Sequence, residues 1–324
     1  MQKYTNRHNI PLSVAVFLAT DTYDRDATCI SATTLVKPLK QVLMGLRVPQ
    51  DKRYTDISSV GASRIGTAIH AAIERAWLGD YESTMKTLGY GQDLIDRVLV
   101  NPLPEELTPD CIPVYLEKRS YREVLGYRVS GQFDIIIDGN LEDFKKTSVY
   151  TWINKTNDKA YTLQGSIYRW LNPELITGDY ITIQFIFTDW TAAQARYNAD
   201  YPQQMFMSYK LPLLTLKDTR EYIVKRLLDI NKYAQVDEVG MPPCSDEDLW
   251  RKPVTYKYYK NPNSLSRSTK NFTSRQEAFV RMQEDNNVGR VVEVPGQVVA
   301  CRYCDAFGIC KQAASYVADG SLTV

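Results

Sequence analysis

The stretch Gly131–Thr147, GQFDIIIDGNLEDFKKT, carries two short apolar runs on either side of Asp138-Gly139-Asn140. A turn sequence of this kind between two apolar runs predicts a tight β-hairpin. Side chains alternate between the two faces of a strand, so Asp143 and Lys145 share one face of the second strand. Pairing of the strands through the turn can bring Asp134 close to both of them.

Two carboxylates side by side repel each other unless a cation lies between them, and Mg²⁺ prefers oxygen ligands. A lysine beside such a site can orient or help deprotonate a water molecule, or neutralise a phosphate. The alternative is that Asp134 is a charge at a strand edge and that Asp143 and Lys145 form a surface ion pair. The pattern Asp-x-Lys after a hairpin does not decide between these interpretations.

Two predicted helices add polar residues to this pattern. From about residue 62 to 78 the apolar positions recur at helical spacing, and this helix carries His70. A histidine there can bind a metal through one ring nitrogen while an acceptor orients the other, or it can be a boundary residue of the core. Gln164 and Tyr168 lie one turn apart on a helix predicted at 159–171, where the alternative is a solvated face with one aromatic residue at its rim.

The remaining periodicities predict an α/β order of elements. We expect a mixed central sheet flanked by helices. The expected helices are 30–47 with an interruption at Pro38, 84–100 and 215–234, and the expected strands are 112–117, 124–138, 141–150 and 180–189, with a turn at Arg119–Arg122.

Composition sets few limits on function. The 324 residues are 44% hydrophobic and 24% charged, which is typical of a globular protein, and a formal net charge of +1 says nothing about a nucleic-acid partner. The apolar stretch at residues 14–19 is too short for a membrane span or a signal segment. We therefore expect a soluble protein of a reducing compartment, without a membrane partner.

Three of the six cysteines, Cys301, Cys304 and Cys310, crowd into the C-terminal tail. Cys-x-x-Cys with a third cysteine nearby is typical of zinc and iron–sulfur sites, and such a site needs a fourth ligand. Cys244 is the first candidate for that ligand and Cys29 the second. The alternative is that the three cysteines are simply buried or free.

Residues 251–275 contain seven Lys or Arg and no Asp or Glu, with several aromatic residues among them. Basic side chains neutralise phosphates, and tyrosines can stack on unpaired bases, so the segment is a candidate DNA contact. The alternative is a solvated loop. The candidate contacts are Lys257, Lys260, Arg267 and Lys270, and the aromatic residues are Tyr256, Tyr258, Tyr259 and Phe272.

Four pieces in this order resemble the PD-(D/E)XK nuclease superfamily, and within it the branch of RecB-like nuclease domains and CRISPR-associated (Cas family-four) exonucleases. The pieces are GTAIH (66–70), GQFD (131–134), EDFK (142–145) and QGSIY (164–168). The flanks look like those of phage-encoded exonucleases of this branch: ISATTLVKPLKQ (30–41), PPCSDEDLW (242–250) and CRYCDAFGIC (301–310). The resemblance therefore covers most of the chain.

The resemblance implies a restriction-endonuclease-like core and a role for each matching residue. His70, Asp134 and Asp143 would bind Mg²⁺ or Mn²⁺, the backbone carbonyl of Phe144 would complete the ligands, and Glu117 is a lesser candidate. Lys145 would act on the attacking water, and Gln164 and Tyr168 would position Lys145 or the DNA backbone. Cys244, Cys301, Cys304 and Cys310 would hold a [4Fe–4S] cluster, although the relatives carry their first cluster cysteine near Lys37-Pro38, where this chain has none; Zn²⁺ is the alternative.

By the same resemblance the chain is a Mg²⁺- or Mn²⁺-dependent deoxyribonuclease, an exonuclease acting on single-stranded or end-containing DNA. The alternatives are a non-catalytic DNA-binding or assembly subunit that keeps the fold, and a zinc-stabilised hydrolase of another phosphoester. We expect a nuclease core at 1–240 and a basic, cysteine-bearing region at 241–324. We also expect recombination or replication proteins, or a second copy of the chain, as partners. The expected location is the cytoplasm, which is that of the host if a phage encodes the chain.

Overall fold

The computed structural model describes residues 3–21, 26, 28–49 and 54–323. The chain divides into two compact units, the first made of Met1–Val36 and Tyr54–Asp229 and the second of Lys37–Arg53 and Ile230–Val324. The expected division at residue 240 differs from this one in two ways: the second unit begins earlier, and it includes a segment from the N-terminal part. The guanidinium of Arg47 explains the second difference, because it donates hydrogen bonds to the carbonyls of Ala234 and Val236, at 3.0 and 2.6 Å.

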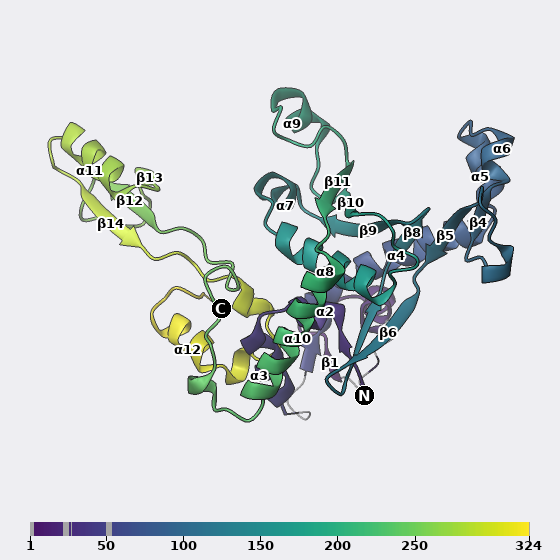
Figure 1. Cartoon of the computed structure of the whole chain (residues 1–324). Helices are drawn as coiled ribbons and strands as arrows, with labels where there is room; N and C mark the ends of the chain where they lie inside the picture. The colour runs from purple at the N-terminus through teal and green to yellow at the C-terminus, as the bar shows by residue number, and fades with distance from the viewer. Residues whose placement is uncertain (1–2, 22–25, 27, 50–53, 324) are drawn as a thin grey trace. The chain divides into compact units, whose positions relative to one another are not determined.

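Six strands form the central sheet of the first unit, in the order β11-β10-β9-β8-β5-β4 (Figure 1). Two neighbouring pairs, β9 with β10 and β4 with β5, are parallel, and the others are antiparallel. This arrangement confirms the expected mixed central sheet. The strands are β4 Val98–Val100, β5 Ile112–Leu116, β8 Ile135–Ile137, β9 Asn140–Thr147, β10 Tyr180–Phe187 and β11 Phe206–Pro212.

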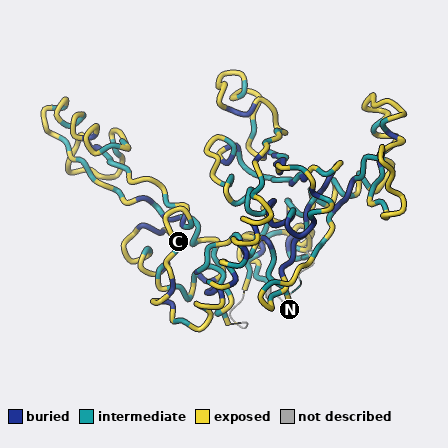
Figure 2. The backbone as a smooth tube through the Cα atoms, viewed as in Figure 1, coloured by how far each residue is buried: buried dark blue, intermediate teal, exposed yellow. Residues whose placement is uncertain are grey.

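Helices lie on both faces of this sheet. On one face Trp77 and Tyr81 pack against a core that includes Ile135. On the other face the ring of Trp152 meets that of Phe185 edge-on at 5.6 Å. Figure 2 shows buried stretches of the chain, and the buried residues include those of β10 and of the side of α8 that faces it. The helices are α4 Gly61–Leu78 and α5 Tyr81–Thr87 on the first face, and α7 Val149–Asn154 and α8 Asp158–Leu171 on the second.

Shorter elements complete the first unit. A three-stranded sheet has the order β2-β7-β6, and β1 pairs with β3. The strands are β1 Lys3–Thr5, β2 Ile30–Ser31, β3 Tyr54–Asp56, β6 Arg119–Val124 and β7 Tyr127–Gln132. The helices and 3-10 turns are α1 Leu12–Ala19, α2 Ala32–Val36, η2 Ile57–Val60, α6 Gln92–Ile95, η3 Pro104–Glu106 and α9 Ala192–Tyr197, and α10 Leu216–Tyr233 continues into the second unit.

The second unit contains a small three-stranded sheet, β13-β12-β14, with helix α11 packed on it (Figure 1). Its elements are α3 Leu39–Arg47, η4 Glu238–Gly240, β12 Thr255–Tyr259, β13 Lys270–Phe272, α11 Arg275–Glu284, β14 Arg290–Val294, η5 Ala300–Tyr303, η6 Phe307–Ile309 and α12 Lys311–Ala318. None of the helices described in either unit is long and apolar enough to cross a membrane.

The predicted hairpin at Asp138-Gly139-Asn140 joins β8 to β9. Ile137 pairs with Asn140, so only two residues form the loop. Both loop residues have positive φ, 48° at Asp138 and 76° at Gly139, as a type I′ turn requires. This turn fixes the register in which Ile135 lies opposite Glu142. Asp134 comes just before β8, and its Oδ2 accepts a hydrogen bond from the N–H of Phe144 on β9 at 2.7 Å.

Two glycines of the quoted motif pieces let α8 approach the sheets closely. A Cβ atom on Gly165 would lie 2.8 Å from Ile181 Cδ1, and a Cβ atom on Gly131 would lie 2.7 Å from Leu171 Cδ1. Both separations are shorter than van der Waals contact. Any larger residue would push the helix away from β7 or β10, and this explains why each motif contains glycine at that position.

The helix predicted at 84–100 is wrong. The segment contains the end of α5, then α6, and then strand β4, which pairs in parallel with β5. Gly89, at φ 89°, follows the first helix, and the apolar run Val98-Leu99-Val100, with its two β-branched valines, joins the sheet through the pairing with β5.

The turn predicted at Arg119–Arg122 is also wrong, as is the single strand 124–138. Residues 119–124 form β6, and the turn lies at Leu125-Gly126, where both residues have positive φ. The chain then breaks at Phe133-Asp134, where it passes from β7 in the small sheet to β8 in the central sheet. Strand β9 ends at Thr147, because α7 begins at Val149.

We predict that Gly139→Ala lowers the free energy of unfolding by about 2 kcal/mol. The left-handed conformation alone costs alanine about 1 kcal/mol. In addition, the new Cβ atom would lie 2.2 Å from Thr177 Oγ1. Gly126→Ala is the matched control, because its φ is also positive and nothing lies within 4 Å of its Cβ position, so it should lose only about 1 kcal/mol. Urea unfolding measures both losses, and equal losses would contradict the predicted contact with Thr177.

Candidate metal centre

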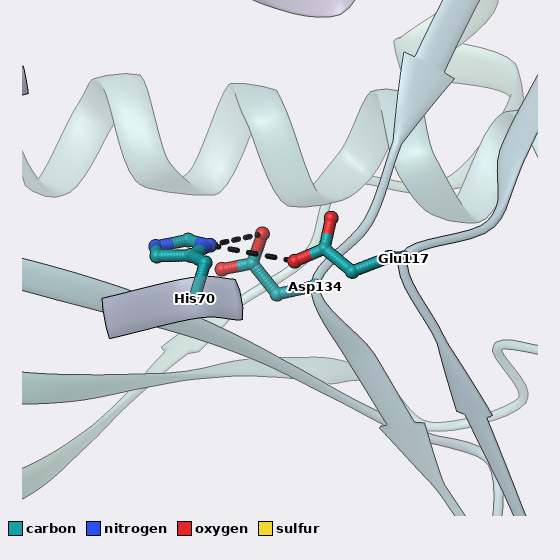
Figure 3. A group of neighbouring side chains, drawn as sticks. All are labelled: His70, Glu117 and Asp134. Atoms are coloured by element: carbon teal, nitrogen blue, oxygen red, sulfur yellow. Dashed lines mark ion pairs between the residues drawn. The ribbon is translucent and has the colours of Figure 1, made fainter. Parts of the chain in front are cut away.

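Three side chains from three different elements meet at the end of the β5–β8 pair. His70 comes from α4, Glu117 follows β5, and Asp134 precedes β8. The Nδ1 atom of His70 lies 3.5 Å from Glu117 Oε1 and 3.4 Å from Asp134 Oδ1. Figure 3 shows that the three side chains point toward one another. Only this group, among the described residues, gathers three possible ligand atoms of His, Cys, Asp or Glu within 4.8 Å of one another.

Glu117 is held in place through both its backbone and its side chain. Its φ is 44°, a conformation that is costly for a residue with a side chain. Its N–H donates to the carbonyl of Asp134 at 2.9 Å. The amide of Gln132 donates to Glu117 Oε2 at 2.9 Å, and the guanidinium of Arg119 donates to Gln132 Oε1 at 2.8 Å. Because arginine can only donate, it fixes the orientation of the Gln132 amide, and Glu117 Oε1 is left to face His70.

His70 makes contact through both ring nitrogens. Its Nε2 lies 3.1 Å from the backbone carbonyl of Phe144. Burial lowers the pKa of His70, but the hydrogen bonds and negative charges of Asp134 and Glu117 outweigh burial and raise that pKa to about 10. The ring is therefore an imidazolium at neutral pH, with one N–H toward the two carboxylates and the other toward Phe144. The carboxylates of Asp134 and Glu117 therefore stabilise a positive charge at the position of the His70 ring.

Asp143 and Lys145 form a buried pair beside this group. Asp143 is 1% exposed, and its Oδ2 contacts the ammonium of Lys145. Its other oxygen, Oδ1, has no hydrogen-bond partner among the described residues. Burial raises the pKa of Asp143 despite Lys145, and the charge of Asp134 raises it further. An unpartnered buried carboxylate oxygen is a costly feature that a bound cation would relieve.

The structure places the expected ligands in two groups, and their binding of a metal stays a prediction. Glu117, the lesser candidate, joins His70 and Asp134, whereas Asp143 pairs with Lys145. The carbonyl of Phe144, expected as a ligand, lies 3.1 Å from Nε2 of His70, and the N–H of Phe144 donates to Asp134 Oδ2 at 2.7 Å. In this position Phe144 orients the imidazole, and Nδ1 remains as the nitrogen that can bind a metal.

Gln164 and Tyr168 lie on helix α8, and their expected role in positioning Lys145 or the DNA backbone stays a prediction. The amide of Gln164 donates to the hydroxyl of Tyr168 at 2.6 Å, so these two residues contact each other as their spacing predicts. The ring that lies over the Lys145 ammonium is that of Tyr161, at 5.7 Å. Sequence reasoning missed Tyr161, Gln132 and Arg119. The only available signal was that Gln132 stands inside the quoted motif GQFD.

The donor atoms fit a divalent cation. Mg²⁺ holds its ligands at about 2.1 Å, so two ligand atoms on one ion lie at most about 4.2 Å apart. The distances of 3.5 and 3.4 Å from His70 Nδ1 to the two carboxylates meet this limit. Carboxylates suit Mg²⁺ and Mn²⁺, and imidazole is accepted more readily by transition metals. His70, Glu117 and Asp134 can therefore hold such an ion, and Asp143 Oδ1 lies close enough for its charge to affect the site.

Four cysteines lie in the second unit near one another. The thiols of Cys244, Cys301 and Cys310 line a small core formed by Leu249, Val298, Ala313 and Leu322. Burial raises the pKa of Cys244 to about 12, with further contributions from Asp248, Cys310 and Cys301. The pKa of Cys304 is raised too, mainly by burial and in part by Cys310. Cys29 lies in the first unit, where its thiol donates to Ser130 Oγ at 2.9 Å.

A buried ion pair borders these cysteines. Lys40 and Glu238 are 7% and 9% exposed, and Lys40 Nζ lies 3.2 Å from Glu238 Oε1. The Glu238 carboxylate accepts hydrogen bonds from the backbone N–H groups of Lys311 and Gln312, at the start of α12. It therefore fixes the turn that carries Cys310. All six cysteines are free thiols in the structure.

The basic segment is not a loop throughout, and its aromatic residues are not all available for stacking. Tyr258 and Tyr259, on β12, are buried, and the hydroxyl of Tyr258 donates to Asp285 at 2.9 Å. The ammonium of Lys260 lies 3.6 Å from the same carboxylate. Strand pairing explains the burial, because it turns these tyrosines into the core of a small sheet. The other expected contacts have separate places: Lys257 is on β12, Lys270 is on β13, and Arg267 lies between the strands.

Comparison with known proteins gives little. No family model and no curated protein matches the chain. The crystal structure of SSO0001 has a TM-score of 0.37 and 17% identity, covering 66% of this chain and 80% of that one. That of a phage related exonuclease from Haemophilus somnus 129PT has a TM-score of 0.25 and 17% identity, covering 36% of this chain and 57% of that one. At these scores neither structure assigns an activity to this chain.

We predict that His70 titrates far above 6.5 when a chelator keeps the protein free of metal. Two carboxylates stabilise its imidazolium, so Glu117→Gln should lower this pKa. Glu123→Gln removes an equal charge from the exposed strand β6 and is the matched control. NMR follows the ring directly, and a His8→Gln variant assigns the two histidine signals. A wild-type pKa of 6.5 or less would contradict the geometry.

Proposed function

We propose that this chain is a Mg²⁺- or Mn²⁺-dependent nuclease that hydrolyses the phosphodiester bonds of DNA. The proposal rests chiefly on one observation: His70, Glu117 and Asp134 gather their ligand atoms beside the buried pair of Asp143 and Lys145. Phosphodiester cleavage needs an activated water, charge stabilisation on the phosphoryl oxygens and support for the leaving oxygen. Divalent ions held by carboxylates supply these.

Each residue has a distinct role in this proposal. His70, Glu117 and Asp134 hold the cation, and Gln132 keeps Glu117 in its orientation. The Lys145 ammonium, held by Asp143 and covered by the ring of Tyr161, orients the attacking water or neutralises the scissile phosphate. The resemblance of the four motif pieces to the PD-(D/E)XK superfamily supports the same assignment.

The preference for DNA ends and single strands rests on the resemblance to the RecB-like branch.

The rival proposal is a non-catalytic DNA-binding or assembly subunit. It is supported by the close pairing of Asp143 with Lys145, because an ion pair of this kind can also serve the fold alone. End-labelled single- and double-stranded DNA separates exonuclease from endonuclease products. A subunit without activity leaves both substrates intact.

We predict that Lys145→Met slows DNA cleavage in Mn²⁺ by about 100-fold or more, because the group that acts on the water or the phosphate is lost. Asp134→Asn should abolish both cleavage and Mn²⁺ binding, whereas Lys145→Met should retain Mn²⁺ binding. Lys146→Met is the matched control, because Lys146 is the next residue on β9 and points to the opposite face. Equal cleavage by wild type and Lys145→Met would sink the catalytic role of Lys145.

We further propose that Cys244, Cys301, Cys304 and Cys310 hold a [4Fe–4S] cluster that fastens the C-terminal segment. The assignment to an iron–sulfur cluster, with Zn²⁺ as the alternative, rests on the resemblance of the C-terminal region. The packing of Cys244, Cys301 and Cys310 against one small core supports a common site for their thiols.

We predict that the anaerobically purified protein is brown and has a broad visible absorbance band. Cys310→Ser and Cys244→Ser should each reduce that band, because each removes a thiolate ligand. Cys111→Ser, which changes a cysteine of the first unit, should leave it unchanged. A colourless protein with one equivalent of zinc would overturn the cluster and favour Zn²⁺ instead.

A further inference from the structure

Lys155 is the C-cap residue of helix α7, and its side chain makes contacts that the proposed catalytic centre does not explain. Its ammonium lies 4.0 Å from the ring centroid of Trp152 and 3.7 Å from that of Tyr209. A lysine held against two rings has lost much of its conformational freedom. In the part of the chain that the structure describes, the ammonium makes no hydrogen bond or ion pair, so its donors face solvent.

The backbone at Lys155 is as unusual as its side chain. Its φ is 50°, in the left-handed region, where glycine or asparagine would be the less strained choice at the end of a helix. Strained positions of this kind cluster at functional sites, and Glu117 in the candidate metal centre is another in this chain. Seven further non-glycine residues of the described chain also have positive φ, so the backbone supports a role for Lys155 only together with its ring contacts.

Lys155 and Lys145 lie on the same face of the sheet, at the two ends of a row of aromatic rings that contact one another. Lys145 lies under the ring of Tyr161, which is 6.2 Å from that of Phe185. Phe185 meets Trp152 edge-on at 5.6 Å, and Trp152 carries Lys155. The pairing of β9 with β10 places Lys145 beside Phe185 in register, so α7 and Lys145 share that face.

An oriented cation with free donors is suited to a phosphate oxygen. Burial lowers the pKa of Lys155, against a smaller opposing effect of Asp158, and a bound anion would restore it. The carboxylate of Asp158 accepts a hydrogen bond from the Tyr209 hydroxyl at 3.0 Å, and among the described residues it forms no ion pair with Lys155. The cation therefore stays available to a ligand.

We propose that Lys155 binds a backbone phosphate of the DNA strand, at a subsite on the same sheet face as Lys145. This inference rests on the proposed nuclease function and adds a strand-positioning contact to it. Lys155 belongs to the first unit, whereas the basic segment 251–275 belongs to the second.

The test is the salt dependence of DNA binding, measured by fluorescence anisotropy with a labelled single-stranded oligonucleotide in EDTA, so that no cleavage occurs. Each phosphate contact to a single strand contributes about 0.7 to the slope of log affinity against log salt. Lys155→Met should reduce the slope by about 0.7 and the affinity at 0.1 M salt by about fivefold. Lys155→Arg should bind as the wild type does.

Two further variants keep the outcome interpretable. Lys155→Asn suits the left-handed backbone, so it tests the lost charge even if Lys155→Met folds poorly. Lys232→Met removes an exposed lysine that also lies over an aromatic ring, 4.9 Å from that of Tyr233, and should change neither slope nor affinity. Wild-type binding with an unchanged slope in Lys155→Met and Lys155→Asn would overturn the Lys155 subsite alone. A wild-type protein that binds no DNA would overturn the nuclease proposal with it.

Discussion

The first unit depends on how it compensates the charges of two neighbouring aspartates, Asp134 and Asp143. Asp134 precedes β8, and Asp143 lies on β9 next to Phe144, whose N–H donates to Asp134 Oδ2. Like charges that interact in a buried place require cations. The structure supplies two, the imidazolium of His70 and the ammonium of Lys145. A type I′ turn sets the register, so the electrostatics of the site begin with a backbone conformation.

The sequence predicted the parts of this site that depend on local periodicity. Alternation along the hairpin placed Asp143 with Lys145, and helical spacing placed His70 on a long helix. The place of Glu117 could not be predicted in this way, because it depends on the antiparallel pairing of β5 with β8 and on a positive φ. The support that Gln132 gives to Glu117 has the same origin, because it arises where β7 ends beside β6.

In the second unit, too, the sequence predicted local features but not those that depend on strand pairing or on contacts between distant residues. Spacing alone identified Cys301, Cys304 and Cys310 as candidate ligands of one metal or cluster. Position in the sequence favoured Cys244 over Cys29 as the fourth ligand. The sequence did not indicate that Tyr258 and Tyr259 would be buried, because an alternation of basic and aromatic residues fits both a nucleic-acid platform and a small core. It also gave no sign of the buried pair of Lys40 and Glu238, since the two residues are far apart in the chain.

The central claim is that His70, Glu117 and Asp134 together bind a divalent cation. Diffraction from Mn²⁺-soaked crystals, measured on both sides of the manganese absorption edge, locates the ion without reference to activity. The claim predicts an anomalous peak between His70 Nδ1 and the two carboxylates, about 2.1 to 2.3 Å from each. A crystal whose manganese peaks all lie elsewhere, with His70 still paired to Glu117 and Asp134, would contradict it.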